Sequence, residues 1–190
     1  MRIRFQQQTQ LPQRQLSEGL ARWLQVCGLC LALSGCLGAP DGIESVRNFD
    51  LERYLGSWYE IARLNHRFEQ GLTQVTATYS PRAEGGVTVV NRGFNTDKNA
   101  WEEADGKAYP VGDPTVGELK VSFFGPFYGG YNIIDLDQED YRYAMVAGPT
   151  RSYLWILARD PALDPATLDR LVEKARALGF DTRELIYVEH

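Results

Sequence analysis

The sequence is poor in cysteine and histidine, with three cysteines and two histidines among 190 residues. Cys27 and Cys30 lie within the first 35 residues, so the chain from Cys36 onward holds one thiol and cannot form an internal disulfide. His190 is the last residue, and His66 has no histidine or cysteine at metal-ligand spacing. The sequence also contains no Gly-x-Ser-x-Gly elbow, P-loop or dinucleotide fingerprint. These absences argue against an enzyme and predict neither a metal nor a cofactor.

Long apolar runs are absent too, and no stretch approaches the roughly 20 residues that a membrane-spanning helix needs. The amino-terminal part nevertheless differs from the rest of the chain. Residues 1–22 contain four arginines and one acidic residue, Glu18, and an apolar stretch follows from Trp23 to Leu33. A basic region followed by a short apolar stretch is typical of a secretory signal peptide. Residues 1–35 are therefore predicted to be removed.

The apolar stretch ends in Leu33-Ser34-Gly35-Cys36, an apolar residue and two small ones before a cysteine. This order resembles a bacterial lipobox, which implies lipid attachment at Cys36 and cleavage before it. The alternative is an ordinary signal peptide that happens to contain cysteine. A lipidated Cys36 would anchor the protein in a membrane, since stable anchoring takes more than one acyl chain. Leu37 follows the cysteine where an aspartate would imply retention in the inner membrane, so the resemblance implies the outer membrane.

The charge balance also limits the possible partners. The chain has 20 basic and 25 acidic residues; removal of the four arginines and one glutamate in residues 1–35 leaves 16 and 24, a net charge of −8. This charge argues against nucleic acid or an anionic lipid surface as an electrostatic partner.

Residues 36–48 contain Gly38, Pro40 and Gly42 and little apolar patterning, which predicts a lipidated tether. Residues 49–190 read as one domain, in which short β-like runs recur with turn residues between them. Eight runs are predicted to be strands: Ser57–Leu64, Thr73–Ser80, Gly86–Gly93, Trp101–Tyr109, Gly117–Phe124, Tyr131–Leu136, Tyr141–Ala147 and Tyr153–Arg159. Eight strands with short connections predict an all-β fold, either an up-and-down antiparallel barrel or a sandwich.

One helix is predicted near the carboxyl end. Asp164-Pro165 supplies an N-cap and a proline at the first helical position. An apolar stripe at helical spacing begins at Leu168, and Gly179 ends the helix. The stripe predicts a helix packed on the outside of the barrel, followed by a short strand, Glu184–Val188.

Three motifs, in order along the chain, resemble the signatures of the lipocalin family: Gly56-Ser57-Trp58, Asp140-Tyr141 and Arg159. Longer runs, such as Tyr-Leu-Gly-Ser-Trp-Tyr-Glu-Ile-Ala-Arg and Leu-Trp-Ile-Leu-Ala-Arg, are similar to the bacterial outer-membrane lipoprotein lipocalins of the apolipoprotein D-like branch. The resemblance covers nearly all of the chain after residue 48. It implies an eight-stranded up-and-down barrel with one outer helix, anchored at the bacterial outer membrane and facing the periplasm.

In an up-and-down barrel the three motifs fall at one end, because odd strands start where even strands finish. The Arg159 guanidinium stacked on the Trp58 indole would close that end, so these motifs are predicted to be structural. The other end is the mouth, where the loop Gly125–Gly130 and the adjoining Phe124 are unusually aromatic. Three roles stay open for this loop: a rim for an entering acyl chain or a membrane, a lid, and a contact in a homodimer.

Eight strands enclose an interior just wide enough for one small ligand. Alternation along the strands predicts ten lining side chains: Val75, Tyr79, Val89, Asn91, Leu119, Phe123, Tyr131, Ile133, Tyr153 and Trp155. Positions matching Tyr79, Asn91, Phe123 and Trp155 line the pocket in the apolipoprotein D-like branch, by resemblance. Plain core packing is the alternative for each of them. Apolar walls with a few polar groups suit a long apolar ligand with a modest polar head.

The resemblance implies a lipid-binding protein that stores or transports fatty acids or lysophospholipids for cell-envelope maintenance. Two alternatives stay open. One is a scavenger of another small hydrophobic ligand; haem is disfavoured because no histidine is predicted to face inward. The other is a structural or interaction lipoprotein whose barrel is filled by its own side chains.

Overall fold

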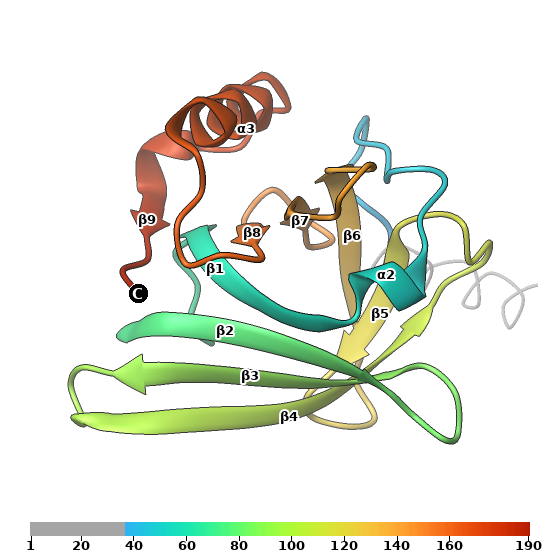
Figure 1. Ribbon diagram of the computed structural model, residues 1–190, viewed down its shortest axis with the longest axis horizontal. Helices are drawn as coiled ribbons and strands as arrows, with labels where there is room; N and C mark the ends of the chain where they lie inside the picture. The colour runs from blue at the N-terminus through green and yellow to red at the C-terminus, as the bar shows by residue number, and fades with distance from the viewer. Residues whose placement is uncertain (1–36) are drawn as a thin grey trace, which may run out of the picture. The chain divides into compact units, whose positions relative to one another are not determined.

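The computed structural model describes residues 37–190 (Figure 1). The predicted signal peptide, 1–35, and the predicted lipid-attachment residue, Cys36, lie outside the described residues. Eight antiparallel strands follow one another around a sheet: β1 Gly56–Leu64, β2 Leu72–Pro81, β3 Val87–Asn95, β4 Ala100–Pro110, β5 Glu118–Ser122, β6 Gly129–Leu136, β7 Tyr143–Ala147 and β8 Leu154–Ala158. Because β1 pairs with both β2 and β8, the sheet closes on itself. The predicted up-and-down barrel is confirmed.

The one helix predicted near the carboxyl end is also confirmed, as α3, Pro165–Ala177. The Asp164 carboxylate accepts a hydrogen bond from the Thr167 N–H at 3.0 Å and caps the helix. Leu171 and Ala175 are fully buried in a cluster that lies between the helix and the outer face of β1, β7 and β8. Among residues 37–190, no helix is long and apolar enough to cross a membrane.

A one-turn helix that the sequence did not indicate, α2 at Leu51–Tyr54, precedes β1. The Asp50 carboxylate accepts hydrogen bonds from the N–H groups of Glu52 and Arg53, at 2.9 and 3.4 Å. Four residues are too few to show a helical apolar period, which is why the pattern missed it. The helix brings the fully buried Tyr54 under the barrel, against Trp58.

The chain after α3 completes the barrel wall. A 3₁₀ turn, η2 at Thr182–Glu184, leads into a short strand, β9 at Leu185–Tyr187. β1 pairs with β2 only over Gly56–Tyr59, and β9 pairs with the far part of β1, Ala62–Leu64. The Glu189 carbonyl then accepts a hydrogen bond from the Gln74 N–H of β2 at 3.0 Å. The end of the chain thus fills the opening between the two strands.

Residues 37–48, which were predicted to be part of a lipidated tether, pack against the barrel. Ile43 is buried, the Val46 N–H donates to the Ile133 carbonyl at 2.8 Å, and the Val46 carbonyl accepts from the Gly117 N–H at 2.9 Å. These contacts are mostly made by the main chain, which leaves no apolar period in the sequence. The packed part of the chain therefore begins well before residue 49.

Candidate functional site

The barrel holds a cavity of about 530 Å³ that extends to the end opposite the three motifs. Nine of the ten side chains predicted to face inward line it: Val75, Tyr79, Val89, Asn91, Leu119, Phe123, Tyr131, Tyr153 and Trp155. Ile133 also faces inward, in the same buried cluster as Val89 and Leu119, but it does not line the cavity.

The opposite end is closed by Arg159. Its guanidinium carbon lies 3.9 Å from the centre of the Trp58 ring, and its N–H groups donate to the carbonyls of Ser57, Arg53 and Tyr141 at 2.9, 2.9 and 3.3 Å. Gly56 has φ of +94°, and a Cβ there would lie 3.3 Å from the Arg159 guanidinium. A glycine therefore suits this position for two reasons.

The two residues of the second motif, Asp140 and Tyr141, differ in burial at this closed end. Tyr141 is buried with φ of +55° in the turn before β7, and its hydroxyl accepts from the Asp50 N–H at 2.9 Å. Asp140 lies on the surface, 3.6 Å from Arg142, and makes no contact with Arg159 or Trp58. The predicted seventh strand opened at Tyr141, but β7 begins at Tyr143, because the chain is still in a turn at Tyr141.

Three tyrosine hydroxyls meet deep in the barrel. The Tyr131 hydroxyl lies 2.7 Å from that of Tyr54 and 2.8 Å from that of Tyr79. Burial raises the pKa of all three, so they stay neutral and offer hydrogen bonds without charge. Tyr79 and Tyr131 also line the cavity, which places hydroxyl groups against its inner part.

A buried charged cluster in the cavity wall was not predicted. Arg63 donates to the Glu60 carboxylate at 2.7 Å, its Nε lies 3.7 Å from Glu69 Oε2, and a second guanidinium nitrogen donates to the Leu72 carbonyl at 3.0 Å. Glu60 and Glu69 line the cavity, and Trp155 Nε1 donates to Glu69 at 3.2 Å. Glu60 lies two residues after Trp58 on the same strand, so alternation along the strand could have predicted that its carboxylate faces inward.

The pKa values of the two carboxyl groups of this cluster are shifted in opposite directions. Burial, and then the neighbouring Glu69 carboxylate, raise the pKa of Glu60 well above its usual value. Burial also opposes ionisation of Glu69, but contacts with the His66 ring and Trp155 lower its pKa overall. The two shifts favour a proton on Glu60 and a negative charge on Glu69, close to the positive charge of Arg63.

His66 lies in the cavity wall, contrary to the prediction that no histidine faces inward. Its ring centre is 5.1 Å from that of Trp155, and its Nε2 is 3.2 Å from Glu69 Oε2. The buried polar atoms around the cavity that have no hydrogen-bond partner within residues 37–190 include His66 Nδ1, Asn91 Oδ1 and Ser122 Oγ. Such atoms favour a ligand that carries at least one polar group.

Residues 49–190 match the family model described as a lipocalin-like domain. The chain belongs to the lipocalin family. It is 53% identical over 162 residues to the outer membrane lipoprotein Blc of Vibrio cholerae, an alignment that covers 85% of this chain and 95% of the relative. The Escherichia coli K12 protein of that name is 55% identical over 150 residues, covering 79% and 84%. Apolipoprotein D of Bos taurus is 32% identical over 158 residues, covering 74% and 82%.

The lipocalin barrel also appears among solved structures. Insecticyanin from Manduca sexta superimposes with a TM-score of 0.64 at 22% identity, over 82% of this chain and 87% of the other. At that identity the likeness concerns the fold alone. The resemblance that the three motifs indicated is therefore confirmed at the level of family and architecture.

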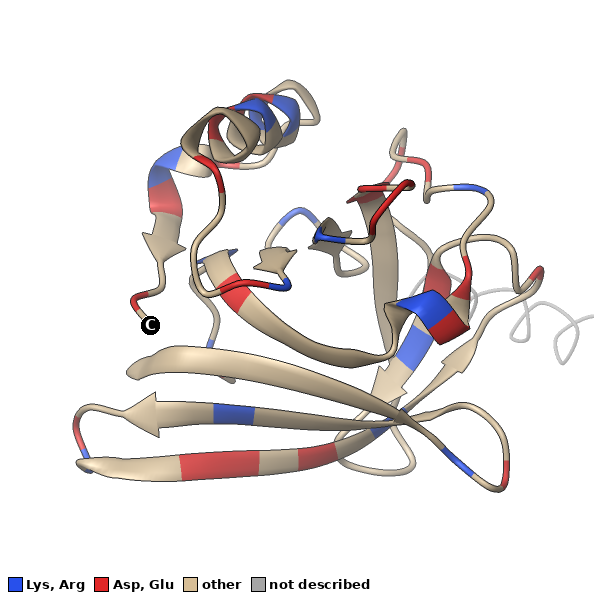
Figure 2. Ribbon diagram, viewed as in Figure 1, with Lys and Arg blue, Asp and Glu red and all other residues tan. Residues whose placement is uncertain are grey.

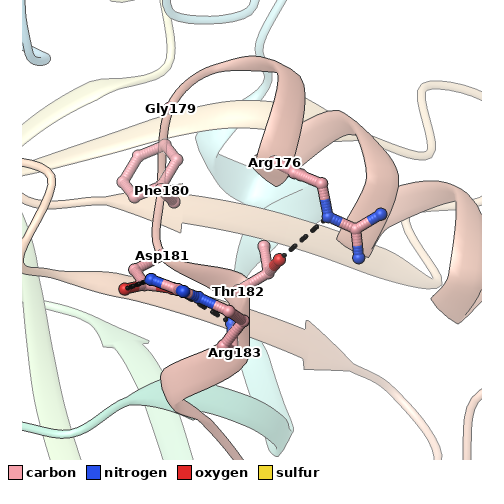
Figure 3. A pocket seen from close by; sticks show the side chains of 6 residues that line it. All are labelled: Arg176, Gly179, Phe180, Asp181, Thr182 and Arg183. Atoms are coloured by element: carbon pink, nitrogen blue, oxygen red, sulfur yellow. Dashed lines mark hydrogen bonds and ion pairs between the residues drawn. The ribbon is translucent and has the colours of Figure 1, made fainter.

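A second hollow of this lipocalin lies on the outside, where α3 leads into η2 (Figure 3). Its polar side chains are paired with one another: Arg183 donates to the Asp181 carboxylate at 2.7 and 2.8 Å, and Arg176 Nε donates to Thr182 Oγ1 at 3.3 Å. Within residues 37–190, no group of three histidine, cysteine or acidic side chains is placed to hold a metal ion. The barrel cavity is the better candidate site.

Proposed function

We propose that this lipocalin is a lipid-anchored protein of the bacterial outer membrane that binds fatty acids or lysophospholipids and stores or transports them for cell-envelope maintenance. Lipid attachment at Cys36 would hold the barrel on the periplasmic side. The relatives named outer membrane lipoprotein support the location, and the lipobox-like Leu33–Cys36 supports the anchor.

The one-ended cavity is the observation that carries this proposal. Its walls are mainly apolar, Arg159 and Trp58 close one end, and its volume of about 530 Å³ lies within the range of about 300–1,000 Å³ typical of small-molecule sites. An acyl chain would lie against Val89, Leu119 and the other lining side chains, and its polar end would meet hydroxyl, amide or imidazole groups. We therefore propose all nine lining residues as ligand contacts, and binding rather than catalysis as the role.

A cavity of this size also argues against a barrel filled by its own side chains. The presence of His66 in the wall removes one reason for disfavouring haem. A lipid with a single polar end accounts for more of the lining than a large flat ligand does.

Native mass spectrometry of residues 36–190 carrying Cys36→Ser tests the proposal. We expect the domain to carry a fatty acid or lysophospholipid from the bacterial host, or to take one up when it is added. Ala77→Phe is the matched control, since Ala77 lines the cavity and a phenyl ring there would occupy the ligand space. A wild-type domain that stays free of lipid under both conditions would contradict the proposal.

A further inference from the structure

The three most exposed large apolar side chains in residues 37–190 gather around the mouth of the cavity. Phe68, between β1 and β2, is 58% exposed, and Phe124 and Phe127, between β5 and β6, are 72% and 79% exposed. All three belong to the cavity lining, and we name them the aromatic rim. Exposed apolar side chains that gather in this way mark an interaction surface.

The point where the described chain begins lies beside this aromatic rim. The Leu37 carbonyl accepts a hydrogen bond from Asn132 Nδ2 at 3.3 Å, and a Cβ at Gly130 would overlap the same carbonyl. Gly130 closely follows Phe127 and belongs to the start of β6. Cys36 is bonded to Leu37, and consecutive Cα atoms are about 3.8 Å apart. A lipid on Cys36 would therefore enter its membrane close to the aromatic rim.

The charge of the domain indicates what kind of surface the rim contacts. The net charge of −8 for residues 36–190 gives no attraction to an anionic surface. Figure 2 shows acidic segments along β4, and Glu102 and Glu103 of that strand border the cavity. Near the rim, the Arg67 guanidinium lies 5.0 Å from the Phe68 ring, where it can pair with a headgroup phosphate. An electrically neutral, zwitterionic phospholipid surface meets these conditions.

We propose that the aromatic rim inserts into the same zwitterionic leaflet that holds the Cys36 lipid, so that the cavity opens toward the bilayer. This inference rests on the lipid anchor of the proposed function. The anchor keeps the rim at a high effective concentration next to the membrane, so weak apolar contacts suffice to orient the barrel. A second protein seated on the rim would cover the entrance, whereas a bilayer there supplies the ligand. Lipid can then pass between leaflet and cavity without crossing water.

Spin labelling of the full lipidated chain in phosphatidylcholine–phosphatidylethanolamine vesicles tests this orientation. Because the Cys36 sulfur is held in the lipid linkage, a cysteine introduced by Phe127→Cys is the one free thiol of the processed chain. The measured quantity is the ratio of the nitroxide's collision rate with dissolved oxygen to its collision rate with a water-soluble nickel chelate. We expect this ratio to be several-fold higher at position 127 than at a matched label. The matched label is at Glu84→Cys, in the exposed turn between β2 and β3 at the closed end.

The outcomes separate the orientation from the anchor. Equal, water-like accessibility at both positions, on a chain whose mass shows the lipid and which floats with the vesicles, would overturn the orientation alone. Magnetic coupling between labels at position 127 of two copies would overturn it in favour of a homodimer contact. A chain whose mass shows no lipid on Cys36 would overturn the anchor, and this inference with it.

Discussion

Replacement of Arg159 by alanine should destabilise the closed end of the barrel without changing the lipid site. The change removes three hydrogen bonds to the carbonyls of Arg53, Ser57 and Tyr141 and the contact with the Trp58 ring at 3.9 Å. Arg159 is half-buried, so we take about 1 kcal/mol for each hydrogen bond. Adding about 1 kcal/mol for the cation–π contact gives a loss near 3–4 kcal/mol. In a domain of this size, that lowers the Tm by about 10 °C.

Thermal unfolding followed by circular dichroism, together with lipid titration, measures both effects. Arg142→Ala is the matched control, because Arg142 is an exposed arginine at the same end whose partners are Asp137 and Asp140. Exposed ion pairs contribute about 0–1 kcal/mol, so this variant should unfold within about 3 °C of the wild type. If Arg159→Ala unfolded no earlier than Arg142→Ala, the geometric reasoning would be refuted. A fall in lipid affinity at unchanged Tm would instead assign Arg159 to the ligand site.

Two further predictions concern the charged cluster and the anchor. The raised pKa of Glu60 means that its stabilising contribution is complete below the unfolded pKa of about 4.3 and is lost as the pH rises through the folded value. Glu60→Gln should therefore flatten the decline in the free energy of unfolding between about pH 5 and pH 9. Parallel curves for the variant and the wild type would contradict this prediction. Cys36→Ala should move the protein from the membrane pellet to the soluble fraction with an unchanged Tm, and continued sedimentation with membranes would show that Cys36 is not the anchor.

The strands and the closed end were predictable because both follow from simple alternation. Most strands have one face in the barrel and one in water, and the up-and-down order of the strands places Arg159 at the Trp58 end. β1 departs from this rule after Glu60. Its outer face is covered by α3, β9 pairs with its far edge, and a bulge between Glu60 and Ala62 shifts the register, so both faces are buried. The burial of Arg63 could not be read from period-2 alternation for that reason.

Other features depend on contacts that have no sequence period. The packing of residues 37–48 rests largely on main-chain hydrogen bonds, which any residue except proline can donate. Glu69 and His66 lie between strands, where no regular geometry fixes the direction of a side chain. They lie in the cavity wall because the Glu69 carbonyl accepts a hydrogen bond from Arg63 at 2.9 Å and the Glu69 carboxylate accepts one from Trp155. Such pairs join residues far apart in the sequence, so they could be identified only from the structure, in which the loop between β1 and β2 lies beside β8.

Because β1 pairs with β8 and β9, closure of the barrel in a newly synthesised chain is delayed until these later strands have been made. β1 ends at Leu64 and β8 begins at Leu154, so about 90 residues must be synthesised before the second edge of β1 finds its partner. At about 5–20 residues per second, this takes roughly 5–20 s. Throughout that time the first strand exposes unpaired N–H and C=O groups, which can pair with another chain. Substitutions that delay closure should therefore lower the yield of folded protein from the cell even where the purified protein melts at the same temperature.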